Sequence, residues 1–247
     1  MIVIDLDGTL LRPDLSVSEH TVKTLEKCRA SGVRVVYATG RGRSAEMVAP
    51  KGLFDAKISM NGATARIGEK IVYNRLIPYL SARPVLLACD RRGLKAASEY
   101  SGMHYSNFAV SEVWPHVTYY KIVDFSQHEM DAEKLNIVVE RPDDATFIKE
   151  RLRGDLHLHV SNDGLAMVMH NEATKARAVA ELARIWNIDR PEIAAFGDDV
   201  NDIDMLNYVG TGIAMGNALP EVKAAASNVC LRNDEDGVAE WIIQNIL

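Results

Sequence analysis

The sequence has little of what disulfide-stabilised or membrane-spanning proteins need. It holds three cysteines in 247 residues, namely Cys28, Cys89 and Cys230. Their odd number and the lack of Cys-x-x-Cys spacing argue against a disulfide framework or a zinc site and favour a reducing cytoplasm. No run of about 18 apolar residues occurs, so the sequence predicts no transmembrane helix.

Positive charge is also scarce. The net charge is -6 and the pI is near 5.7, with no run of Lys or Arg. These values argue against a general nucleic-acid or membrane-surface binder. The N-terminus has no basic region before an apolar one, and Asp5 and Asp7 would interrupt a signal peptide. We therefore expect neither a nucleic acid nor a membrane as a partner, and the sequence leaves open whether the protein is a monomer or a small homo-oligomer.

What remains is ordinary globular composition, 47% hydrophobic and 25% charged, long enough for one large or two modest domains. The opening stretch organises the rest. Ile2-Val3-Ile4 suits a strand buried on both faces, and Asp5, Asp7 and Gly8 follow where it should end. In open α/β sheets, ligands bind beyond the carboxyl ends of strands. The two acids either serve a phosphate there, with a cation offsetting their repulsion, or form a solvated strand end.

A strand–helix–strand unit follows from this opening. Ser16 and Ser18 are competing N-caps for a helix to about residue 29, and Gly32 is placed to end it. Residues 33–38 then form a second strand. This pattern is typical of the βαβ unit of a parallel sheet.

The second strand ends at Thr39-Gly40. The Thr39 hydroxyl would point at a bound oxyanion, and Gly40 would let its backbone N–H approach the same group. Alternatively, Thr39 only caps a helix starting near Arg43. A neighbouring strand that ends in Asp-x-Asp favours the contact with phosphate. Further along, residues 57–60 form another strand, and Asn61 either supplies a turn or faces a substrate.

The pattern changes between residues 80 and 170, which we expect to be a separate α+β module inserted into the first. Helices are predicted at 84–92 and 143–152, and strands at 134–140, 156–160 and 165–170. The last two are joined by a hairpin around Asn162-Asp163-Gly164. His157, His159 and His170 are either a metal site or ordinary strand histidines, and the absence of a nearby cysteine favours the latter. Candidates for contacting a substrate, unless they pack within the module, are Met103, His104, Tyr105, Trp114 and His116.

The alternating pattern resumes at residue 171, so we expect one domain from 1–79 with 171–247 and an insertion at 80–170. Lys175 falls in the first turn of a helix, where a cation is out of place unless an anion lies nearby. A strand ending at Gly197 is followed by Asp198, Asp199, Asn201 and Asp202. Acids this close are costly without a cation, and oxygen ligands suit Mg²⁺. Asp198 is the better ligand candidate, because Asp199 and Asp202 also suit a helix cap.

Four segments together resemble the haloacid dehalogenase superfamily of phosphohydrolases, in its Cof-like branch. They are Asp5–Leu11, Ala38–Arg41, Lys175 and Gly197–Asp202, and the segments Ala214–Ala218 and Asp234–Val238 are also similar to this branch. The resemblance is weak through the insertion, and Ala176 stands where the branch usually has Gly. It implies a doubly wound, Rossmann-like parallel sheet with an inserted α+β cap domain.

The resemblance also implies a reaction with a small phosphate ester, such as a sugar phosphate. Asp5 would form an aspartyl-phosphate, and Asp7 would act as acid and then as base. Mg²⁺ would be held by Asp5, the Asp7 backbone carbonyl and Asp198, with Asp202 bound directly or through water. The phosphate oxygens would be bound by Lys175, Thr39, Gly40 and Asn201.

Three other functions compete with that of a phosphatase. A phosphomutase shares the scaffold and would return the phosphoryl group to the substrate. A non-catalytic phosphosugar sensor would be expected to lack a catalytic acid, whereas Asp5, Asp7, Lys175 and Asp198 are all present. A two-component receiver would be about half this length and would have no inserted module.

Overall fold

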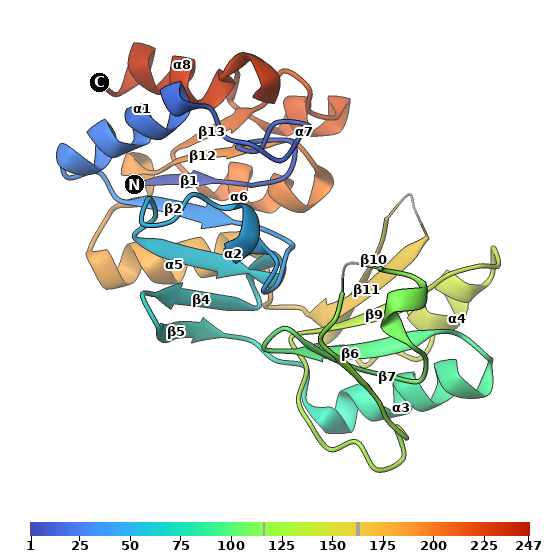
Figure 1. Cartoon of the computed structure of the whole chain (residues 1–247). Coiled ribbons are helices and arrows are strands. Elements are labelled where there is room, and N and C mark those ends of the chain that lie inside the picture. The colour runs from blue at the N-terminus through green and yellow to red at the C-terminus, as the bar shows by residue number, and fades with distance from the viewer. Residues whose placement is uncertain (116, 162–163) are drawn as a thin grey trace. The chain divides into compact units, whose positions relative to one another are not determined.

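The structure is a computed structural model that describes residues 1–115, 117–161 and 164–247 (Figure 1). His116, Asn162 and Asp163, which the sequence analysis placed at a substrate contact and in a hairpin turn, lie outside the described residues. The chain divides into two compact units. One combines Met1–Asn74 with Thr174–Leu247 and is called the core here; the other, Arg75–Ala173, is called the insert. That residues 80–170 act as a cap domain stays a prediction.

The core is built on an eight-stranded sheet in the order β14-β13-β12-β1-β2-β3-β4-β5. Its strands are β1 (Ile2–Ile4), β2 (Val35–Ala38), β3 (Ala56–Ser59), β4 (Thr64–Ile67), β5 (Lys70–Asn74), β12 (Ala194–Gly197), β13 (Thr211–Ala214) and β14 (Asn228–Val229). All pairings from β14 to β3 are parallel, and the β4–β5 hairpin continues the sheet in antiparallel pairing. The predicted doubly wound sheet is confirmed.

Helices cover both faces of this sheet. They are α1 (Glu19–Ala30), α2 (Ala45–Val48), α5 (Lys175–Trp186), α6 (Ile203–Tyr208), α7 (Pro220–Ala225) and α8 (Gly237–Asn245), with the 3₁₀ turns η1 (Met60–Gly62), η3 (Arg190–Glu192), η4 (Val200–Asp202) and η5 (Asn233–Glu235). Helix α1 lies beside α8 on one face, and α5 beside α6 on the other (Figure 1). Right-handed crossovers explain this, because β1 to β2 and β12 to β13 run in opposite directions across the sheet.

Local sequence explains where the main helices begin. Ser18, one of the two N-caps that the sequence offered, caps α1, its side chain accepting a hydrogen bond from Thr21 N, and Ser16 does not cap the helix. Thr174 caps α5 in the same way, accepting from Arg177 N. Both helices bury apolar side chains, among them Leu25 of α1 and Leu182 of α5, in one core with the fully buried strands β1 and β2. The carboxyl ends of β1, β2, β12 and β13 therefore meet at one edge of a rigid sheet.

The insert contains a second sheet in the order β10-β11-β9-β6-β7-β8. Its elements are α3 (Tyr79–Arg91), β6 (Ala96–Tyr100), β7 (Met103–Ser106), η2 (Val110–Glu112), β8 (Tyr120–Ile122), β9 (Lys134–Val138), α4 (Asp144–Lys149), β10 (Leu156–Val160) and β11 (Leu165–His170). The pairings are antiparallel apart from β7–β8, as expected of an α+β module. Among the described residues, no helix of either unit is long and apolar enough to cross a bilayer.

The predicted start of the first helix in the insert was wrong. Helix α3 begins at Tyr79, five residues before Pro84, which therefore lies inside it rather than in its first turn. The ring of Pro84 conflicts with the carbonyl of Leu80, four residues earlier. Leu80 is 56% exposed, so that carbonyl lies on the solvent side of the helix, where water can satisfy it.

Candidate active site

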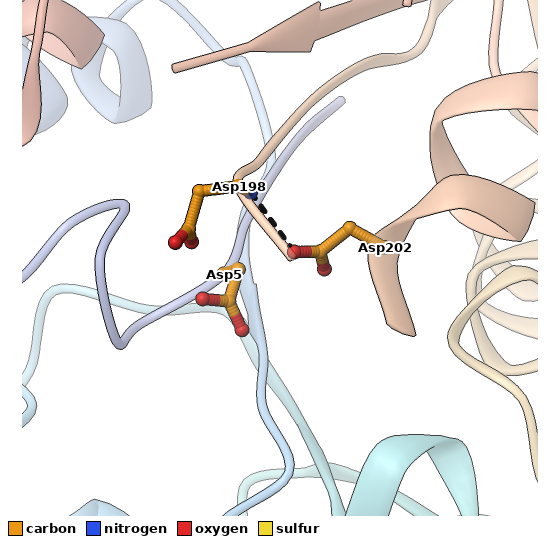
Figure 2. Close-up of side chains that lie close together, drawn as sticks. All are labelled: Asp5, Asp198 and Asp202. Carbon is orange, nitrogen blue, oxygen red and sulfur yellow. Dashed lines mark hydrogen bonds between the residues drawn. The ribbon is translucent and has the colours of Figure 1, made fainter. Parts of the chain in front are cut away.

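Three carboxyl groups converge at the carboxyl edge of the core sheet. Asp5 follows β1, Asp198 follows β12, and Asp202 ends η4. One carboxylate oxygen from each lies within 4.8 Å of the others, and this is the only group of three or more potential metal-ligating side chains among the described residues. Figure 2 shows the three side chains, with Asp202 turned toward the backbone of Asp198. The sequence placed these acids at strand ends, and the fold brings the strand ends together.

Lys175 joins two of the three acids. Its Nζ donates to Asp5 Oδ1 at 2.6 Å and to Asp202 Oδ1 at 2.6 Å. The lysine is 1% exposed, so it is not a solvated first-turn residue. Burial alone would lower its pKa, but the Asp202 and Asp5 carboxylates raise it, so the side chain stays charged. Lys175 lies in the first turn of α5, where a cation is expected only beside an anion, and the anions there are the carboxylates of Asp5 and Asp202.

The acids are nevertheless short of positive charge. Burial raises the pKa of Asp5 well above its ordinary value despite Lys175, and Asp202 and Asp198 raise it further. Burial likewise raises the pKa of Asp198 to about 6, although the Thr9 hydroxyl opposes this. With all three carboxyl groups ionised, the Lys175 ammonium would leave two excess negative charges. A divalent cation would balance that excess.

The donor set fits Mg²⁺. All the candidate ligand atoms are carboxylate oxygens, which hard cations prefer. Asn201 adds a buried Oδ1 atom that has no hydrogen-bond partner among the described atoms. Asp202 is less open to a cation than the other two acids, because its Oδ2 already accepts from Asp198 N and Asp199 N at 3.0 and 3.2 Å. Asp199 itself is exposed and caps η4 through Val200 N.

Asp7 lies apart from these three acids and is held by an arginine. Its side chain is 47% exposed. Arg41 Nε and Nη2 donate to Asp7 Oδ2 and Oδ1 at 2.7 and 2.6 Å, a bidentate fork that fixes the carboxylate plane. Arg41 stands in the Ala38–Arg41 motif, but its sequence position alone predicts no role, because an arginine after a strand does not indicate its partner.

Thr39 and Gly40 lie at the end of the neighbouring strand β2. Thr39 is fully buried, and its Oγ1 accepts from Arg41 N at 3.1 Å. It does not cap α2, which begins at Ala45 after Ser44. A hydroxyl that accepts a bond keeps its proton to donate, so Thr39 remains suited to an oxyanion.

Two further residues of the site were missed or left undecided. Thr9 is buried, and its Oγ1 donates to Asp198 Oδ1 at 2.7 Å. Asn61 has left-handed φ of 53°, and its Oδ1 accepts from Asn201 Nδ2 at 3.0 Å. Asn61 also donates its backbone N–H to Thr39 O, so it both makes the turn and links two strand ends. The turn signal alone cannot separate these roles.

The histidines of the insert form no comparable group. His157 and His159 lie on one face of β10, as their spacing predicted, and their cross-strand neighbours on β11 are Met169 and Met167. The described residues contain no cluster of ligating side chains around them. That these are ordinary strand histidines stays a prediction.

Comparison with known proteins gives one consistent picture. The model of the haloacid dehalogenase-like hydrolase family matches residues 2–242. Phosphatase YwpJ of Bacillus subtilis is 30% identical over an alignment that covers 98% of each sequence. The crystal structure of TM0651 from Thermotoga maritima superposes with a TM-score of 0.88 at 26% identity, covering 100% of this chain and 97% of that one.

A second similar structure belongs to a named subclass of the superfamily. It is that of BT4131, described as a subclass IIB sugar phosphatase of the same superfamily, with a TM-score of 0.86 at 25% identity over 98% of this chain and 97% of that one. The family match covers nearly the whole sequence, both units included. The chain belongs to the haloacid dehalogenase-like hydrolases and, within them, to the Cof-like phosphohydrolases.

Proposed function

We propose that this enzyme removes phosphate from a small phosphomonoester, such as a sugar phosphate, through an aspartyl-phosphate on Asp5. The observation that carries the proposal is the meeting of Asp5, Asp198, Asp202 and Lys175 at one edge of the sheet. A nucleophile, a fixed cation and a cation-binding acid set are the parts that phosphoryl transfer needs. The sugar phosphatase name of BT4131 supports the substrate class.

Asp5 supplies the nucleophile in this proposal. One of its oxygens is held by Lys175 at 2.6 Å, which leaves the other to attack phosphorus in line with the leaving oxygen. The new bond joins Asp5 Oδ to phosphorus as the ester P–O bond breaks. Lys175, the Thr39 hydroxyl, the Gly40 N–H and Asn201 bind the phosphoryl oxygens and hold the group in this geometry.

Asp7 moves the proton in both halves of the reaction. It first protonates the leaving alkoxide, then takes a proton from the water that attacks the aspartyl-phosphate, which releases inorganic phosphate and restores Asp5. The bidentate fork of Arg41 orients Asp7 as a carboxylate, the form that takes the proton from water, and the proton then on Asp7 is the one given to the next leaving alkoxide. When bound by Asp5, the Asp7 carbonyl and Asp198, Mg²⁺ supplies positive charge that screens the developing charge on the phosphoryl group.

We propose further that the insert, as the cap, selects the leaving group. Glu99, His104 and Lys134 are direct cross-strand neighbours and so share one face of its sheet. This polar face suits a hydroxyl-rich leaving group better than an apolar one. The aromatic candidates pack within the insert: Trp114 lies against His104, and Tyr105 against His128.

Phosphate release from a panel of sugar phosphates and other phosphomonoesters, with Mg²⁺ and with chelator, tests the proposal. We expect release that requires the cation, and we expect Asp5→Asn to abolish it without unfolding the protein. Asp204→Asn, a change at an exposed acid in the first turn of α6, is the matched control and should behave as the parent does. Retention of the parental rate by Asp5→Asn would refute the mechanism. An isomeric sugar phosphate in place of inorganic phosphate would identify a mutase instead.

A further inference from the structure

Two C-terminal segments have no part in the proposed chemistry, although both resemble the family. They are Ala214–Ala218 and Asp234–Val238. Each segment contains or directly follows an asparagine whose side chain is hydrogen-bonded to the loop after β1. Asn217 lies within the first segment, and Asn233 immediately precedes the second. The contacts of these two side chains span 209 and 222 residues of sequence.

The two asparagines form a continuous set of hydrogen bonds with residues 8–11, called the nucleophile loop here. Asn217 Nδ2 donates to Gly8 O at 2.7 Å, and Asn233 Nδ2 donates to Leu11 O at 2.7 Å. Asn233 N donates to Asn217 Oδ1 at 3.0 Å. Because that bond fixes the Asn217 amide oxygen, the amide nitrogen must face Gly8. Two carbonyls of the loop are thus satisfied by side chains.

The nucleophile loop in turn sets the place of Asp198. Thr9 Oγ1 donates to Asp198 Oδ1 at 2.7 Å. Gly8 has φ of +75°, and a Cβ atom there would lie 2.2 Å from Asp198 Oδ2, so the carboxylate packs directly on the glycine backbone. A loop that shifted at Gly8 or Thr9 would move this carboxylate relative to Asp5.

We infer that Asn217 and Asn233 are positioning residues of the cation site. They hold the nucleophile loop, and through Gly8 and Thr9 they keep the Asp198 carboxylate facing Asp5. The inference rests on the proposed function in one respect, that Asp198 binds the cation. It explains why two segments near the end of the chain belong with a site whose nucleophile is the fifth residue.

The test replaces each amide by an uncharged side chain of similar size, as Asn217→Leu and Asn233→Leu. Asn245→Leu is the matched control, because Asn245 Nδ2 also donates to a carbonyl, Trp241 O, at 2.7 Å but is exposed on α8. Binding of Mg²⁺ is measured by titration calorimetry, and kcat and KM are measured as functions of Mg²⁺ concentration.

We expect both substitutions at the loop to weaken Mg²⁺ binding by about 10-fold or more, as loss of partners around a metal site does. Added Mg²⁺ should restore part of kcat, and KM for the substrate should stay unchanged at saturating cation. The control should match the parent. A residue that only stabilised the fold would lower the melting temperature without moving the Mg²⁺ dependence.

Folded loop variants that bind Mg²⁺ as tightly as the parent would overturn the inference, and so would a parent that binds no Mg²⁺. If a leucine variant does not fold, Asn217→Ser and Asn233→Ser remove the same donors with less bulk and are judged by the same titration. Failure of the proposed function is distinguishable, since a parent that binds Mg²⁺ but releases no phosphate would refute the activity and leave the positioning role standing.

Discussion

The core and the insert both bury carboxyl groups, but the partners of Asp144 in the insert offset the cost of burial, whereas those of Asp5 and Asp198 in the core do not. In the insert, Asp144 is fully buried, and it accepts from Arg92 Nε at 2.8 Å and from the backbone N–H groups of Arg141 and Glu140. Burial would raise its pKa, yet the Arg92 and backbone bonds outweigh this and lower it. In the core, Asp5 and Asp198 have raised pKa values because their partners do not offset burial.

The direction of the pKa shift distinguishes a structural carboxylate, such as Asp144, from the carboxylates of the candidate active site. Burial of an acid does not mark function, because a fully hydrogen-bonded acid such as Asp144 stabilises its fold as an anion. A buried acid whose pKa is raised, because neighbouring positive charges do not offset its burial, instead indicates a binding site for a charged ligand. In the core that ligand would be the cation and the phosphate. Three pairs of matched substitutions, each pair with one residue in the core and one in the insert, test this contrast.

The largest contrast is expected between two buried lysines. Lys175→Met removes the cation between Asp5 and Asp202, and we expect turnover of p-nitrophenyl phosphate to fall by about 10²–10³-fold, as when a charge-stabilising donor is removed. Lys134→Met in the insert, whose Nζ lies 3.8 Å from Glu99, should change this turnover far less, because p-nitrophenyl phosphate lacks the hydroxyl-rich leaving group that the polar face with Glu99 is proposed to select. Circular dichroism confirms that both are folded. Equal losses would mean that burial, not the site, decides the effect.

Two arginine forks give the next contrast. Arg41→Gln frees the Asp7 carboxylate, and we expect kcat for a sugar phosphate to fall by about 10–100-fold because the proton donor is no longer held in place. Arg92→Gln breaks the bonds to Asp143 and Asp144, and should lower the melting temperature while leaving kcat unchanged. Steady-state kinetics and thermal unfolding separate the two. An Arg41→Gln enzyme with parental kcat would show that Asp7 needs no fork.

The smallest contrast concerns stability without metal. The pKa of Asp198 is raised from 3.8 to about 6, so its contribution to stability falls as pH rises from 3.8 to about 6 and stays low above that. In chelator at pH 7.5, Asp198→Asn should therefore raise the free energy of unfolding. Two pKa units correspond to about 3 kcal/mol, which partial exposure reduces to roughly 1–2 kcal/mol.

Asp144→Asn should act in the opposite direction. The pKa of Asp144 is lowered, so its contribution is present at neutral pH and is lost as pH falls through the ordinary carboxyl range. Loss of its charged hydrogen bonds should cost about 2 kcal/mol. Calorimetric unfolding between pH 4 and pH 8 measures both variants. If Asp198→Asn destabilised the metal-free protein, Asp198 would be a structural acid like Asp144.

The sequence predicted the core more completely than the insert. Strand runs such as Ile2–Ile4 are short, apolar and followed by polar residues, so their ends were recognisable. In the insert, residues 93–123 gave no separable pattern, because β6 and β7 bury polar residues such as Ser98, Glu99 and Ser106. A strand that buries polar side chains among its apolar ones has no hydrophobic period to detect.

By itself the sequence determined the family motifs, the parallel sheet and the acids at the strand ends, because strand ends and turns are local features, whereas the order of the strands came from the structure. The tertiary structure alone decided which groups meet. Lys175 is buried between Asp5 and Asp202, and Arg41 donates two hydrogen bonds to Asp7. Asn217 donates a hydrogen bond to Gly8 O and accepts one from Asn233 N. The Asn233 side chain donates another to Leu11 O. Those contacts join residues that lie up to 222 positions apart, and only strand pairing brings them within hydrogen-bond distance.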